Sequence, residues 1–259
     1  MWRHMVQPPA ADSQWPARID AVARQADLGE HRGSHRWTLI WNRPLILALI
    51  LLGGAAIGLV SVGAPAAAIL ATIPAVVIGG GYALHAAANR GARLDIFERG
   101  ITVVQRGKLR VVRYDDTALW QNIVDYHHTL GSQRRYSYRL RDTSGAKFTI
   151  TGNFQQPTEW GPTIQRAVTD AQLPVAWAAI MAGQRLEFGR IWVTAQQVGT
   201  GTSGWPWSRV SDITVTNGTV NVRSEERPKL LVYEAVRQIP NFFVFLALTE
   251  RLRAARPIS

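Results

Sequence analysis

The sequence predicts an α+β membrane protein in which an N-terminal two-helix hairpin precedes two strand-rich modules, each closed by a C-terminal helix. Three observations predict this class. Residues 44–88 carry no charged side chain at neutral pH when His85 is neutral. After residue 93, apolar residues alternate with polar ones, as in strands with one buried face. The order of motifs in residues 91–183 then recurs in residues 184–259, which indicates a duplicated module.

The composition limits the classes of function. The chain has 259 residues and no cysteine, so disulfides, zinc–thiolate clusters and thiol chemistry are excluded. Its 29 lysines and arginines outnumber its 18 acidic residues, which gives a net charge of +11. A chain that is this basic and also 47% hydrophobic is typical of a membrane protein whose cytoplasmic side carries the positive charge.

Residues 1–36 are polar and contain three prolines. The spacing of Ile19, Val22 and Ala23 weakly favours a short amphipathic helix, but its apolar face is thin. We therefore expect a flexible cytoplasmic leader. His31 and His35 are four residues apart, as two metal ligands on a helix would be, but no third ligand is near and a solvated pair is expected.

Residues 37–90 are predicted to form a transmembrane hairpin. Its two apolar blocks, residues 45–64 and 66–88, each have the roughly 20 residues that cross a bilayer as a helix. Arginines flank the pair, and none lies between the two blocks, which places both termini in the cytoplasm of a multi-pass plasma-membrane protein. A cleaved signal peptide is disfavoured because more than 40 residues precede the first block.

Glycines thin both helices of the hairpin. Gly54 and Gly58 are four residues apart, and Gly79, Gly80 and Gly81 are consecutive. Such residues let helices pack closely, either within the hairpin or between two copies of the chain. Both alternatives are open at this point.

Residues 91–183 are predicted to form the first module. Alternating runs at residues 136–141 and 148–151 indicate strands of an antiparallel sheet. Tight turns are predicted where glycine follows a polar residue, at Arg99-Gly100, Arg106-Gly107 and Ser144-Gly145. A helix is predicted after Pro157, because apolar residues from Trp160 to Ala171 recur at helical spacing.

Residues 184–259 repeat this order as the second module. Leu186-Glu-Phe matches Leu94-Asp-Ile-Phe, Trp207 matches Trp120, and a second helix follows Pro240. Asn217-Gly218 is a further turn signal. Because Trp120 and Trp207 each precede a branched aliphatic residue at the same point of a module, we expect both in the core rather than against a ligand.

The chain resembles an uncharacterised family of membrane proteins from high-GC Gram-positive bacteria. The resemblance is carried by Leu28-Gly-Glu-His-Arg32, Phe97-Glu-Arg-Gly-Ile101, residues 120–123, Phe188-Gly189, Trp207 with Val210, and residues 239–248. It implies a two-helix hairpin followed by tandem pleckstrin-homology-like modules. The family has no assigned activity, so the resemblance implies no reaction.

No motif for catalysis, a cofactor or a metal emerges. The run Gly199-Thr-Gly-Thr-Ser-Gly204 has the spacing of a dinucleotide loop, but Trp205-Pro206 and another strand follow it instead of a helix. We therefore predict no enzyme activity and no cofactor. An enzyme with an unrecognised site is a remote alternative.

Basic residues gather in residues 90–150, directly after the predicted spans. A basic face placed there would meet the anionic inner leaflet, at about 1 kcal/mol per basic residue. The candidate contacts with anionic lipid headgroups lie in two loops: Arg106, Lys108, Arg110, Arg113, Arg134 and Arg135. The alternative is that this charge only reflects the positive-inside rule.

The expected function is that of a membrane-anchored, non-catalytic binding or scaffold protein. Its partners would be the bilayer itself, anionic phospholipid headgroups, or a membrane or envelope protein. The alternative is an accessory subunit or sensor of an envelope protein complex. Nucleic acid is not expected, because aromatic residues are not interleaved with the basic ones and no recognition helix is evident.

Overall fold

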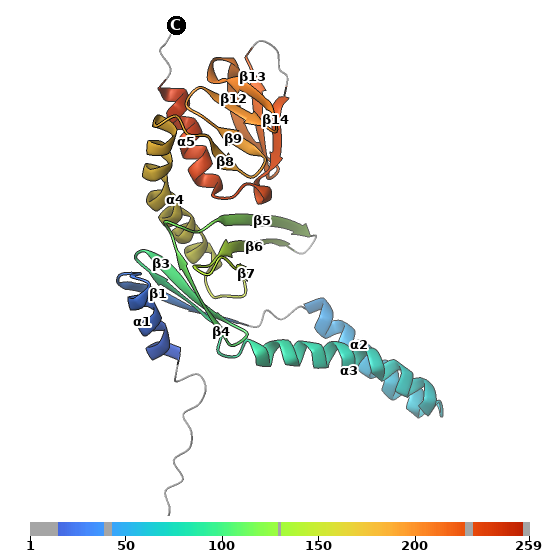
Figure 1. The fold of residues 1–259 in the computed structure, drawn as a ribbon. Helices are drawn as coiled ribbons and strands as arrows, with labels where there is room; N and C mark the ends of the chain where they lie inside the picture. Colours follow the sequence, from blue (N-terminus) through green and yellow to red (C-terminus); the bar gives the residue numbers. More distant parts are fainter. Residues whose placement is uncertain (1–14, 39–42, 129–130, 226–229, 256–259) are drawn as a thin grey trace, which may run out of the picture.

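The computed structural model describes residues 15–38, 43–128, 131–225 and 230–255 (Figure 1). Within these residues the chain forms five α-helices and fourteen strands, and the strands make four antiparallel sheets. The α+β class is therefore confirmed. Two strand-rich units follow one another, and a helical arm projects from the first of them (Figure 1).

The first unit contains a four-stranded and a three-stranded sheet. The four-stranded sheet has the order β1-β2-β3-β4, with bounds His31–Arg36, Arg93–Phe97, Gly100–Gln105 and Lys108–Arg113. The other sheet has the order β5-β6-β7, with bounds Leu119–His128, Gly131–Arg141 and Lys147–Thr151. Their inner faces enclose one apolar core, which includes Leu94, Ile101, Leu140 and Ile150.

The segment before the hairpin belongs to the first unit. Residues 15–36, which we expected in a flexible leader, form α1 (Trp15–Gln25) and β1. Strand β1 pairs with β2 across the intervening hairpin, and Ile19 and Ala23 of α1 pack on Phe97 and Val104. The thin apolar face of α1 is sufficient because the sheet supplies the opposing apolar surface.

The expected hairpin is present as α2 (Arg43–Ser61) and α3 (Pro65–Ala88), but the prediction of two membrane spans is corrected. No helix in the described part of the chain has both the length and the apolar character needed to cross a bilayer. Half of the 24 residues of α3 are alanine or glycine, which contribute less apolar surface than leucine or isoleucine. The predictions of a multi-pass plasma-membrane protein, cytoplasmic termini and a membrane-anchored function rested on these spans and are corrected with them.

The second unit repeats the layout of the first. Its four-stranded sheet has the order β11-β10-β9-β8, with bounds Ser203–Pro206, Gln197–Thr200, Ile191–Val193 and Leu186–Phe188. After the short helix η2 (Trp207–Arg209), its three-stranded sheet contains β12 (Val210–Thr216), β13 (Thr219–Ser224) and β14 (Leu230–Ala235). The short helix η3 (Val236–Gln238) and α5 (Phe242–Ala254) close the unit.

The two units obtain their fourth strand differently. With Leu94 matched to Leu186, strands β2, β3 and β4 correspond to β8, β9 and β10. The first unit adds β1 next to β2, whereas the second adds β11 next to β10. Each addition lengthens the sheet at the opposite edge.

One long helix packs into the cores of both units. Helix α4 (Pro157–Met181) buries Trp160, Ile164 and Val168 in the first core. Further along, Ile180 is buried in the second core. Because 25 residues of helix extend roughly 37 Å, a single helix reaches both cores and connects the units.

The turn predictions hold at two hairpins. Arg106 and Gly107 have φ values of 51° and 70°, and Gln105 pairs with Lys108 on either side of them. Asn217 and Gly218 have φ values of 51° and 69°. Two central residues with positive φ are the requirement of the two-residue hairpin turn that matches the twist of the strands.

Candidate functional site

The six predicted headgroup contacts are divided between the two sheets of the first unit. Arg106, Lys108, Arg110 and Arg113 lie on the β3–β4 hairpin, whereas Arg134 and Arg135 lie on β6 in the other sheet. Two of the six are already neutralised. Arg113 forms a bidentate ion pair with Asp115 at 3.0 and 2.6 Å, and Arg110 donates to Asp142 at 2.9 Å.

Asp142 organises the turn between β6 and β7. Its Oδ1 accepts hydrogen bonds from the backbone and hydroxyl of Ser144 and from the backbone N–H of Ala146. Burial disfavours the charged carboxylate, but these hydrogen bonds and that of Arg110 outweigh it, and the pKa of Asp142 is lowered. Arg110 therefore supports the fold rather than offering a free cation.

We expect Asp142→Asn to lower the free energy of unfolding at pH 7 by about 1–3 kcal/mol, since it breaks a partly buried charged network. Because the folded state lowers the pKa, the stabilisation is present above the ordinary aspartate pKa, about 3.9, and is lost as pH falls through the folded value. Urea unfolding at pH 7 and across the acidic range measures both effects. If the variant and the wild type lost stability equally as the pH falls, the charged Asp142 carboxylate would not stabilise the fold.

The strongest candidate site is a groove beside Trp120. Trp120 on β5 lies opposite Arg139 on β6, which in turn lies opposite Thr149 on β7. Cross-strand partners point to the same face, so these three side chains share the outer face of the sheet. The Arg139 guanidinium lies 4.9 Å from the centre of the Trp120 ring, and the Lys147 ammonium lies 5.0 Å from it.

Residues of the second unit complete this groove. Arg237 and Gln238 of η3 line it together with the residues of β5, β6 and β7, and it encloses about 340 Å³. The remaining lining residues are Gln121, Asn122 and Ser137. No carboxylate lines the groove, and within the described residues Arg139, Lys147 and Arg237 have no ion-pair partner. The groove is therefore cationic and lies at the junction of the two units.

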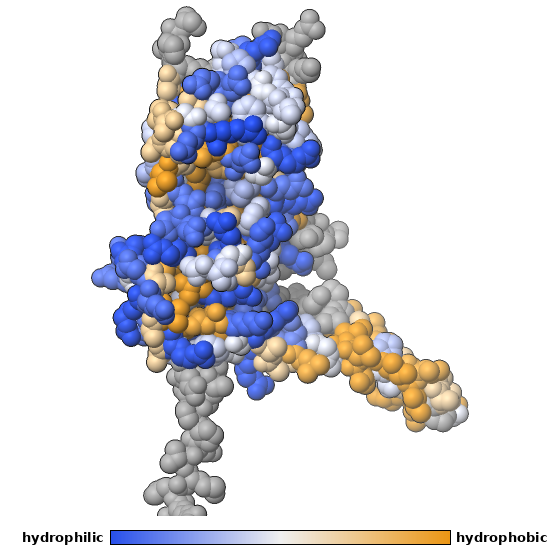
Figure 2. Space-filling view, viewed as in Figure 1, coloured by the Kyte–Doolittle hydropathy of each residue, from blue (hydrophilic) through white to orange (hydrophobic). Residues whose placement is uncertain are grey.

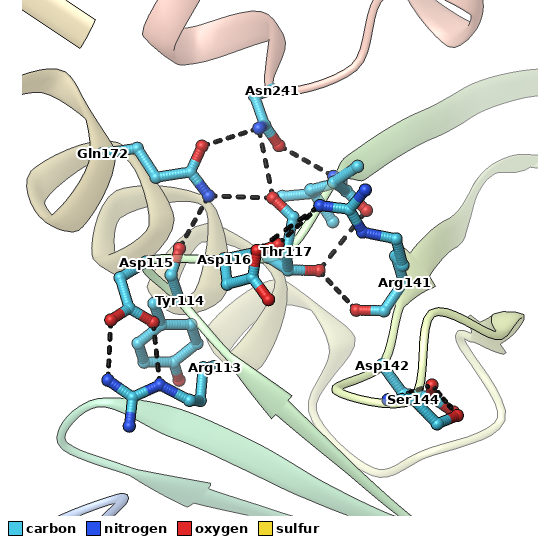
Figure 3. A network of polar contacts seen from close by, with 12 residues as sticks. Arg113, Tyr114, Asp115, Asp116, Thr117, Arg141, Asp142, Ser144, Gln172 and Asn241 are labelled. Carbon is cyan, nitrogen blue, oxygen red and sulfur yellow. Dashed lines mark hydrogen bonds and ion pairs between the residues drawn. The ribbon is translucent and has the colours of Figure 1, made fainter. Parts of the chain in front are cut away.

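A polar joint holds η3 against the first unit (Figure 3). The backbone N–H of Asn241 donates to the Leu119 carbonyl, and the Leu119 N–H donates to Asn241 Oδ1, both at 2.8 Å. Asn241 Nδ2 donates to Gln172 Oε1 at 2.7 Å and to the Thr117 carbonyl at 3.2 Å. Gln172 on α4 donates in turn to the carbonyls of Tyr114 and Thr117. Because Arg237 lies four residues before Asn241, this joint fixes Arg237 beside the sheet.

The expectation that both repeated tryptophans lie in the core holds only for the second unit. Trp207 is 4% exposed and packs in the second core, where its Nε1 donates to the Thr194 carbonyl at 3.0 Å. Trp120 is half-buried and lies on the outer face of its sheet. The reason is that Trp120 is the second residue of β5 and its strand neighbours Leu119 and Gln121 point inward, whereas Trp207 lies on the short helix η2.

The two histidines of β1 are not the solvated pair we expected. His35 is buried, and His31 Nε2 lies 3.0 Å from Ser34 Oγ and 3.3 Å from Asp95 Oδ1. Ser34 also donates to Asp95, and Arg93 binds the same carboxylate. In a catalytic triad the serine and the carboxylate bind opposite nitrogens of the histidine. Here both face Nε2, so the cluster attaches β1 to β2 and does not form a triad.

The Gly199–Gly204 run packs against an indole. A side chain at Gly199 would place its Cβ 2.2 Å from Trp192 Cζ2, and one at Gly204 would lie 2.5 Å from Trp192 Cη2. Gly201 has a φ of 56° in the turn between β10 and β11. These contacts account for the glycines without a nucleotide, in agreement with the strand that follows them.

Sequence reasoning did not single out Arg139, Lys147 and Arg237 as a group. Arg139 and Lys147 occupy polar positions of the alternating strands, and this alternation could have placed both side chains on the outer face of the sheet. Arg237 lies 98 positions after Arg139, and nothing in the sequence indicates that the two lie at one groove.

Fold and groove together define a two-unit α+β protein with a cationic groove at the junction of its units. A model of a family of unknown function, DUF6585, matches residues 5–257, and the chain belongs to this family. No curated protein and no solved structure matches the chain.

Proposed function

We propose that this chain is a non-catalytic binding protein made of two pleckstrin-homology-like units, and that the groove beside Trp120 binds a phosphate group. The layout of each unit, a four-stranded sheet, a three-stranded sheet and then a helix, supports the pleckstrin-homology-like assignment. A source in a high-GC Gram-positive bacterium remains a prediction from the resemblance.

The observation that carries the proposal is a pair of cations at the Trp120 indole together with a third cation, Arg237, that lines the adjoining groove. Contacts with Trp120 restrain Arg139 and Lys147 before any ligand arrives, so little side-chain entropy is lost on binding. Arg237 adds a third charge from the other unit. Since no carboxylate lines the groove, an incoming anion has no internal competitor.

The neutral lining favours phosphate over a carboxylate. Asn122, Ser137, Thr149 and Gln238 offer donors besides the two guanidinium groups. A phosphate has three or four acceptor oxygens to use them, whereas a carboxylate has two. Arginine also binds phosphate through two parallel hydrogen bonds. A groove of about 340 Å³ suits a small phosphorylated group better than a folded partner.

The test is isothermal titration of the full chain with inorganic tripolyphosphate. We expect the double variant Arg139→Gln, Arg237→Gln to lose at least tenfold in affinity, because each charged hydrogen bond contributes about 1.5–3 kcal/mol. The matched control is Arg106→Gln, Lys108→Gln, which removes the same charge from the β3–β4 hairpin. Sedimentation with phosphatidic acid vesicles is the second arm and distinguishes a lipid headgroup from a free phosphate.

Two results would overturn the proposal. If both double variants lose affinity equally, binding reflects net charge and not the groove. If wild type binds neither tripolyphosphate nor the vesicles, the groove is not a phosphate site.

A further inference from the structure

A second groove lies in the second unit, where α4 and α5 both end. It encloses about 380 Å³, which is within the range of small-ligand pockets. Trp177 and Met181 of α4 line it, together with Leu252 and Ala255 at the end of α5. Seven of its nine lining residues are apolar, and none of the nine is charged. The lining is therefore suited to an apolar ligand.

The second core holds part of this lining in place. Trp207 and Leu252 are only 4% and 6% exposed, so packing restrains both side chains. Trp207 Nε1 donates to the Thr194 carbonyl, and the Trp207 backbone N–H donates to the Gln196 carbonyl, both at 3.0 Å. A ligand would meet a largely preformed surface, so little entropy would be lost in ordering it. Met181 is 52% exposed, and its flexible thioether chain can adjust to the shape of a ligand.

A cation stands at the edge of this apolar groove. The Arg251 guanidinium lies 6.0 Å from the centre of the Trp177 ring, which lines the groove. Arg251 lies four positions before Ala255, so the two residues share one side of α5. Within the part of the chain that the structure describes, Arg251 has no ion-pair partner. An anion bound beside Trp177 would therefore meet a positive charge that no carboxylate neutralises.

We infer that this groove binds an amphipathic anion, a carboxylate with an unbranched aliphatic chain. The apolar lining favours the chain, because each buried methylene is removed from water. Arg251 favours the charged end. Inorganic phosphate fits the groove poorly, since only Gln196 and Ser208 of its lining residues carry polar side chains besides the two indole N–H groups. The inference does not depend on the phosphate site, because the two grooves share no lining residue.

Isothermal titration of the full chain with hexanoate, octanoate and decanoate tests the ligand class. We expect the affinity to rise about tenfold with each two added methylenes. Arg251→Gln should lower the affinity for octanoate at least threefold and leave the affinity for octanol unchanged, because only the carboxylate uses the charge. An affinity that does not depend on chain length would overturn the inference. So would an equal effect of Arg251→Gln on octanoate and octanol.

The site needs its own test, because the arm of α2 and α3 is a second hydrophobic surface (Figure 2). Ala255→Trp fills the groove and should lower the affinity for decanoate at least tenfold. The matched control is Ala254→Trp, since Ala254 is exposed on the same helix but does not line the groove. Urea unfolding of both variants shows that each is folded. Wild-type affinity in Ala255→Trp, an equal loss in both variants, or no binding of decanoate to wild type would overturn the inference.

Discussion

We expect Trp207→Ala to lower the free energy of unfolding by about 3–5 kcal/mol, and Trp120→Ala to lower it by only about 1 kcal/mol. Trp207 is enclosed by the second core and donates a hydrogen bond to Thr194, so truncation leaves a cavity and an unpaired carbonyl. Trp120 is half-buried against Arg139 and Lys147, so its removal exposes little core. Urea denaturation of the two variants measures the difference.

The two variants also separate stability from binding. Trp120→Ala should weaken tripolyphosphate binding because it releases two of the three cations, while the protein stays folded. Trp207→Phe is the conservative control and should recover most of the stability, since the ring fills most of the cavity. Similar losses of stability for Trp120→Ala and Trp207→Ala would contradict the outer position of Trp120.

We expect Asn241→Ala to destabilise the protein by about 2–4 kcal/mol. The change removes the acceptor of the Leu119 N–H and the donor to Gln172, which leaves part-buried polar groups unpaired. It also places alanine at a φ of 49°, a left-handed conformation that asparagine and glycine tolerate better. Urea denaturation measures the loss of stability.

Asn241→Gly separates the two causes. Glycine accepts the left-handed conformation but makes none of the side-chain hydrogen bonds. We expect Asn241→Gly to be about 1 kcal/mol more stable than Asn241→Ala. The rest of the loss relative to wild type should remain, because glycine makes no side-chain hydrogen bonds. Because Asn241 holds η3, both variants should also weaken binding at the groove. Full stability of Asn241→Gly would show that the side-chain hydrogen bonds of this joint contribute nothing.

Several elements follow from local sequence. The hairpin helices, the helix after Pro157 and the turns at Arg106-Gly107 and Asn217-Gly218 were predicted because periodicity and positive-φ residues act over a few positions. The interpretation of the hairpin as membrane spans was wrong, since charge-free length alone does not measure how apolar a helix is. The role of residues 15–36 was also missed. The apolar face of α1 packs on strands β2 and β3, which lie far along the chain.

The candidate site was less predictable than the fold. Counting basic residues selected Arg110 and Arg113, whose carboxylate partners lie 32 and 2 positions away. A count of charges does not show which cations are already paired. The groove needs Arg139 and Arg237 from different units, and their proximity depends on the Asn241 joint.

The sequence by itself determined the hairpin helices, the helix after Pro157, the duplication and the absence of cysteine chemistry, because these depend on local spacing and composition. The tertiary structure alone decided that β1 joins the first sheet, that α4 enters both cores, and that Trp120 faces outward while Trp207 is buried. It also decided which arginines remain unpaired. The physical reason is that burial and ion pairing depend on contacts between distant segments, and those contacts exist only once the sheets and α4 have packed.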